Sequence, residues 1–104
     1  MSSTSTILAS IKSKVHRVLP DAKVMLFGSR AYGNPTSESD WDILILTPGP
    51  VNSELKKNIH VSLFPLSVEI GGFINALTIQ ESEWQNNPSY YSLQQTLKSG
   101  TVQA

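Results

Sequence analysis

Hydrophobic residues near the start of the chain recur every three or four positions, as they do along one side of an amphipathic helix. The pattern stops at Pro20, which cannot continue a helix, and Thr4 or Ser5 is a suitable N-cap. We therefore expect a helix that ends before Pro20, after a polar and disordered N-terminus over residues 1–5. The apolar positions of this helix are Ile7, Leu8, Ile11, Val15, Val18 and Leu19.

Two mostly apolar runs come next, over residues 22–27 and 41–47. Their length and their β-branched and aromatic content are typical of buried strands, and the glycine or proline after each run ends it. Between the runs we expect a turn at Gly28 and Ser29 and a short helix up to Tyr32. A break over residues 33–35 and a polar loop over residues 36–39 would then lead to the second strand.

Apolar residues lie four apart over residues 51–63, which predicts a further helix with Ser53 as a possible N-cap. We expect strands over residues 66–70 and 73–79, and the two glycines between them fit a hairpin turn, a bulge or a kink. A last short helix should precede Gly100. A helix between strands predicts an α/β arrangement.

Composition narrows the class of protein. The chain has 104 residues, enough for one domain over residues 1–104 with a single core, and its 39% hydrophobic and 15% charged content excludes intrinsic disorder. Eight basic residues balance eight acidic ones, so no overall field attracts nucleic acid or a membrane surface, and no apolar stretch has membrane-spanning length. The lack of cysteine excludes disulfides and thiolate metal sites and fits a cytoplasmic location.

Candidate chemistry lies between the first two predicted strands. Gly28 ends a strand and Ser29 opens a helix, so backbone N–H groups and a hydroxyl are available to cradle a phosphate. Asp40 and Asp42 are two positions apart, and on a strand both carboxylates would project from the same face. Such a pair beside a phosphate cradle suits Mg²⁺ carried by a triphosphate, and Arg30 is either a further phosphate contact or a surface residue.

The combination of Gly28 and Ser29 with Asp40 and Asp42 resembles the motif of the polymerase-β-type nucleotidyltransferase superfamily. The short chain is similar to the minimal nucleotidyltransferases within it. This resemblance implies an α+β fold with a small mixed sheet flanked by helices. It also implies that Gly28 and Ser29 hold a nucleoside triphosphate, expected to be ATP, and that the two aspartates hold catalytic Mg²⁺.

Active members of that superfamily carry a third carboxylate on a later strand, which acts as the general base and completes a second metal site. Counting back from Glu83 and Trp84 places this position near Asn75, an amide and a poor base. Glu69 is the nearest alternative, and we take it as the third catalytic carboxylate or as a glutamate facing solvent. Two Mg²⁺ ions are expected only if a third carboxylate is present.

Two functions follow. The first is an enzyme that transfers a nucleoside monophosphate to a hydroxyl acceptor, on a partner protein or elsewhere. The second is a nucleotide-binding module with little or no activity, of the antitoxin type, that pairs with a small helical protein as minimal nucleotidyltransferases do in toxin–antitoxin systems. An exposed sheet edge also fits a homodimer.

Overall fold

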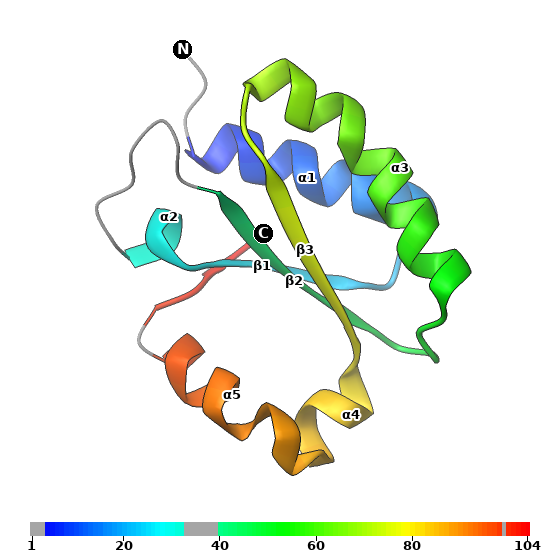
Figure 1. Cartoon of the computed structure of the whole chain (residues 1–104), viewed down its shortest axis with the longest axis vertical. Helices are drawn as coiled ribbons and strands as arrows, with labels where there is room; N and C mark the ends of the chain where they lie inside the picture. The colour runs from blue at the N-terminus through cyan, green and yellow to red at the C-terminus, as the bar shows by residue number, and fades with distance from the viewer. Residues whose placement is uncertain (1–3, 33–39, 99) are drawn as a thin grey trace.

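The computed structural model describes residues 4–32, 40–98 and 100–104, without the side chains of Ser29 and Tyr32. The expected break over residues 33–35 and loop over residues 36–39 lie outside the described residues. Helices lie against both faces of one sheet (Figure 1). The elements in chain order are α1 (Thr4–Val18), β1 (Lys23–Phe27), α2 (Ser29–Tyr32), β2 (Trp41–Thr47), α3 (Ser53–Ile70), β3 (Ile74–Gln80), α4 (Glu81–Asn86), the 3₁₀ turn η1 (Pro88–Tyr90), α5 (Tyr91–Lys98) and β4 (Val102–Gln103).

The sheet is mixed, as the family resemblance implies, and its strand order is β3-β2-β1-β4. β2 pairs antiparallel with β1 and parallel with β3, and the connection between these parallel strands is the helix α3. β4 adds to β1 in the antiparallel sense. β2 is therefore central, and burial from both faces explains why its sequence is apolar at nearly every position.

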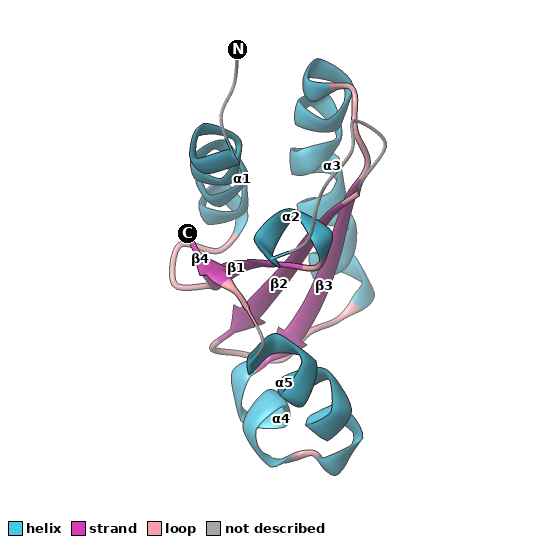
Figure 2. Ribbon diagram, turned by 90° about the vertical axis from the view of Figure 1, so that its left-hand side faces the viewer, coloured by secondary structure: helices cyan, strands magenta, loops and turns pink. Residues whose placement is uncertain are grey.

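The two faces of the sheet carry separate groups of core residues. α1 and α3 cover one face, and α4 and α5 pack against the other (Figure 2). Because side chains alternate along a strand, Trp41, Ile43 and Ile45 face α1 and α3, whereas Leu44 and Leu46 face α4 and α5. The helical residues at these cores are Leu8, Ile11 and Val15 of α1, Ile59, Leu63 and Leu66 of α3, and Leu97 of α5.

The strand predicted over residues 66–70 is wrong, because this segment is the last part of α3. Residues 66–70 alternate apolar and polar side chains as a strand does, but so short a run does not decide between strand and helix. Here Leu66 continues the helical spacing of Ile59 and Leu63. Gly71 ends the helix in the left-handed conformation, with φ 67°, and its N–H donates to Val68 O. Of the three roles left open for the two glycines, none applies: they form a helix C-cap.

Other differences lie at the ends of elements. α1 already includes Thr4 and Ser5, so the predicted disorder does not extend to these two residues, and residues 1–3 lie outside the described part. The N-cap of α3 is Asn52 rather than Ser53, since its side chain accepts the Leu55 N–H at 2.8 Å. α4 and β4 are further elements that the sequence pattern did not predict. Among the described helices, none combines the length and apolar character that a membrane crossing needs.

Candidate active site

Asp42 and Asn75 lie side by side where β2 and β3 begin. Asp42 pairs with Phe27 of β1 on one side and with Asn75 of β3 on the other. The amide Nδ2 of Asn75 donates to Oδ1 of Asp42 at 3.3 Å. Strand alternation puts Asp42 on the sheet face of Leu44, toward α4 and α5, and its side chain is half-buried. The second carboxylate of the predicted pair therefore has a neutral partner.

Gly28 borders the same carboxylate from the end of β1. Its φ of 79° lies in the left-handed region that glycine adopts without strain. A Cβ atom built there would overlap Oδ2 of Asp42 and would lie 3.1 Å from its Cγ and 3.2 Å from its Cβ. The absence of a side chain at Gly28 is thus what allows the backbone to approach the Asp42 carboxylate.

The backbone after Gly28 turns directly into α2. Ala31 N–H donates to Gly28 O at 3.0 Å, which closes the first turn, and Ser29 is the first residue of the helix. The predicted strand, turn and short helix are therefore present in this order. The Ser29 hydroxyl lies outside the described atoms, so its contact with phosphate stays a prediction.

Trp41 anchors the segment between the two aspartates. Its N–H donates to Phe73 O at 2.9 Å, and its indole is 3% exposed in the core under α1 and α3. The guanidinium carbon of Arg30 lies 4.3 Å from the centroid of a Trp41 ring, which is a cation–π contact. Arg30 is thereby held next to the Asp40–Asp42 segment. Asp40 itself lies one residue before β2 and is exposed.

Glu69 does not take the place that the sequence suggested. It lies in the last turn of α3, not on a strand, and it is exposed. Within residues 4–32, 40–98 and 100–104, no three histidine, cysteine or acidic side chains come together as a metal-binding group. Glu69 therefore does not complete a three-carboxylate site with Asp40 and Asp42, and the solvent-facing alternative describes its position.

The remaining donors suit a hard cation bound through few protein ligands. Mg²⁺ commonly takes one or two carboxylates and fills its octahedral shell with water and substrate phosphate oxygens. Asp42, with Asp40 two residues before it, supplies carboxylates of this kind beside a backbone that a Cβ would block. The residues present fit one such ion, which Asp40 and Asp42 would hold, and within the described part of the chain no third acidic ligand joins them for a second ion.

Sequence reasoning proposed the positions of this site but not the contacts between them. It placed the third position near Asn75, but not the hydrogen bond to Asp42, which depends on the register of β2 and β3. It missed the contact between Arg30 and Trp41. The available signal was only that Arg30 and Trp41 both lie within the motif that runs from Gly28 to Asp42.

Comparison with known proteins identifies the family of the chain. No curated protein matches the sequence. The family described as "Nucleotidyltransferase domain" matches residues 5–88, a segment that runs from α1 to the first residue of η1 and contains Gly28, Asp40, Asp42 and Asn75. The chain belongs to the nucleotidyltransferase domain family.

Proposed function

We propose that the chain binds a Mg²⁺-nucleoside triphosphate and transfers the nucleoside monophosphate to a hydroxyl acceptor. One observation carries the proposal: the Asp42 carboxylate lies against the backbone of Gly28, so that a carboxylate and a strand-to-helix turn meet at one point. Asp40 and Asp42 would hold the ion, and Gly28 and Ser29 would contact the phosphates. ATP is the nucleotide we expect.

The transfer itself is an in-line substitution at the α-phosphorus. The acceptor oxygen forms a new bond to phosphorus while the bond to the bridging oxygen breaks, and pyrophosphate leaves with that electron pair. Bound Mg²⁺ would supply neutralisation of the charge on the phosphates. The proton of the acceptor hydroxyl must pass to solvent water, because the amide of Asn75 is not a base that takes it. We therefore expect transfer to be slow.

A second function is favoured by this same amide. Asn75 occupies the position directly across from Asp42, and an Asn there keeps a hydrogen-bond partner for the carboxylate without adding charge. A site of this kind supports binding of one Mg²⁺-nucleotide with little or no turnover. The chain would then act as an antitoxin-type module through a protein partner, for which a small helical protein and a second copy of the chain are the two candidates.

The two functions are separated by measuring binding and transfer on the same samples. Binding is measured by isothermal titration with ATP and Mg²⁺. Transfer is measured with ATP labelled at the α-phosphate, in the presence of an extract of the source cell, by following the label on proteins and small molecules. Binding with transfer supports the enzyme, binding without transfer supports the module, and neither would contradict both.

The variant that tests the site is Asp42→Asn, which preserves shape and an acceptor for Asn75 but removes the charge. We expect it to lose Mg²⁺-dependent ATP binding. Asp21→Asn is the matched control, because Asp21 is an exposed aspartate in the turn between α1 and β1. Unchanged ATP binding by Asp42→Asn would contradict the proposed site. A cytoplasmic location stays a prediction of the cysteine-free sequence.

A further inference from the structure

The outer edge of β3 is open in the described part of the chain. β3 is the first strand in the order β3-β2-β1-β4, so only its β2 side is paired there. Its seven residues, Ile74–Gln80, include no charged side chain and no proline. Natural proteins usually protect edge strands with such residues, because unpaired N–H and C=O groups attract another strand. β3 therefore has the backbone chemistry to accept one.

A groove follows this edge between β3 and α3. It has a volume of about 310 Å³, and its walls come from one side of α3 and from residues 73–78. Ile59 and Leu63 give it an apolar base, and they belong to the core beneath. We call it the β3 groove. Its size reaches the lower end of the range for ligand sites, about 300–1,000 Å³.

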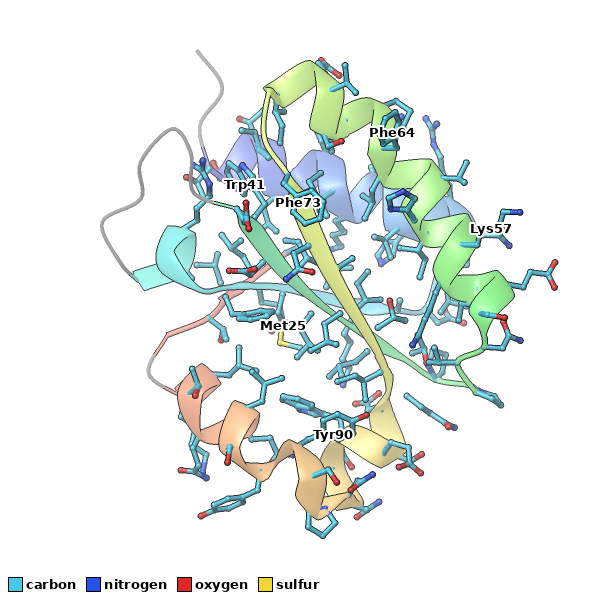
Figure 3. All side chains as sticks on the ribbon, in the orientation of Figure 1. Met25, Trp41, Lys57, Phe64, Phe73 and Tyr90 are labelled. Atoms are coloured by element: carbon cyan, nitrogen blue, oxygen red, sulfur yellow. The ribbon has the colours of Figure 1, made fainter. Side chains whose placement is uncertain are left out.

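The two ends of the β3 groove differ in chemistry. Since only residues 71–73 connect α3 to β3, the C-terminal end of the helix lies beside the start of the strand. Phe64 and Phe73 line this end, and they are 57% and 60% exposed. Figure 3 shows both phenylalanines at the upper part of α3 and β3. Lys56, near the start of α3, lines the other end.

Charge distinguishes the possible occupants. None of the described residues that line the β3 groove is acidic, and Lys56 and His60 are the basic side chains among them. A second copy of the chain that paired through β3 would bring no acidic side chain of that strand to Lys56, because β3 carries no charged residue. The charge of the groove therefore favours a segment with negative charge over a second copy.

We propose that the β3 groove binds an extended acidic segment of another protein, which adds a strand to β3. Main-chain hydrogen bonds to the open edge would supply affinity, and alternate side chains would enter the groove and contact Phe64 and Phe73. Acidic side chains would approach Lys56. The site is separate from nucleotide binding, although Asn75 borders both the groove and Asp42.

The test uses a fluorescein-labelled peptide of seven residues, the length of β3, in which alternate positions, which share one face of a strand, hold valine toward one end and glutamate toward the other, with threonine between them. Binding is followed by fluorescence anisotropy without nucleotide or metal, so that the result does not depend on the proposed function. We expect saturable binding of this peptide, and binding at least about tenfold weaker for its lysine–valine counterpart and for a version with a central proline. Equal binding of all three would overturn the proposal.

Charge reversal provides the matched pair of variants. Lys56→Glu should weaken binding of the acidic peptide and strengthen binding of the basic one. Lys57→Glu changes the net charge by the same amount outside the groove and should affect peptide binding less. Lys57 does not line the groove, and its side chain points away from β3 in Figure 3. Both lysines are exposed, so both variants should fold. An equal effect of the two variants would overturn the groove, and a dimer in sedimentation velocity that Phe64→Ser dissolves would replace the proposed occupant with a second copy.

Discussion

Asn75 lies directly opposite Asp42 in the parallel pair of β2 and β3, and its amide donates to the Asp42 carboxylate at 3.3 Å. The pairing makes Asn75 a neutral neighbour of the one half-buried carboxylate at the candidate site, where a second acid would repel it. The charge of the site, and with it the number of acidic groups available to a cation, therefore depends on whether position 75 carries an amide or a carboxylate.

Asn75→Asp should make this site more dependent on divalent cations. Two carboxylates directly opposite each other repel, so in the absence of metal we expect a loss of stability of about 0.2–1 kcal/mol. Added Mg²⁺ should restore it, because a ligand that binds only the folded state stabilises that state. Thermal unfolding with MgCl₂ and with EDTA measures the effect.

Asn75→Ala is the control, since it removes the hydrogen bond without adding charge and should gain nothing from Mg²⁺ relative to the native chain. If transfer from ATP is slow because the third position is an amide, Asn75→Asp should also transfer faster. If the stability of Asn75→Asp responds to Mg²⁺ no more than that of Asn75→Ala, the proposed position of the ion is contradicted.

Gly28→Ala should destabilise the fold more than the same change at the other glycine with positive φ. The left-handed backbone alone costs alanine about 1–2 kcal/mol. Overlap with the Asp42 carboxylate adds an overpacking cost of about 1–3 kcal/mol. Gly71→Ala is the matched control, because Gly71 has φ 67° and a Cβ there would meet no atom within 4 Å, so it should show the backbone cost alone. Urea unfolding compares the two variants. Equal losses of unfolding free energy would mean that the Asp42 side chain moves aside at no cost.

Arg30→Gln should affect both stability and nucleotide affinity. Loss of the contact with Trp41 should cost about 0.5–2 kcal/mol in urea unfolding. If the guanidinium also contacts phosphate, ATP–Mg²⁺ binding should weaken by about tenfold, or ~1.4 kcal/mol, in isothermal titration. Arg17→Gln, an exposed position late in α1, controls for the change in net charge. A loss of stability with unchanged affinity would limit Arg30 to its contact with Trp41.

Leu97→Ala should test whether α5 is an integral part of the domain, since it lies beyond the matched residues 5–88. Leu97 is 8% exposed and packs with Leu44 and Ile79, so truncation should cost about 2–5 kcal/mol of unfolding free energy. Tyr91 in the same helix is 62% exposed, so Tyr91→Ala should change stability by about 0.5 kcal/mol or less. Similar small losses would show that α5 packs only loosely on the sheet.

Much of the fold could be predicted because each early element carries its own local signal. α1 follows an apolar stripe that Pro20 ends, and β2 coincides with residues 41–47 because burial on both faces makes the whole run apolar. The end of α3 could not be predicted in this way, since a five-residue run with three apolar residues before a glycine fits a strand and a capped helix equally well. β4, with two residues paired to β1, has no pattern of its own.

The candidate site was predictable where it depends on neighbours along the chain and not where it depends on neighbours in space. Gly28, Asp40 and Asp42 are recognisable from residue type and spacing. Glu69 was a candidate because a strand was predicted over residues 66–70. These residues belong to α3, and the Glu69 carboxylate lies on the exposed surface of that helix. The relation between Asn75 and Asp42 required the strand register, which no local pattern encodes.

The close approach of Gly28 to Asp42 also limits how this protein can change. Any side chain at position 28 competes for the volume of the Asp42 carboxylate, so a substitution there becomes acceptable only after Asp42 has been replaced by a smaller residue. The replacement of Asp42 would remove the charge at the centre of the candidate site. Loss of the glycine and loss of the acid are therefore linked events, and we expect an evolving or engineered variant to give up the two positions together.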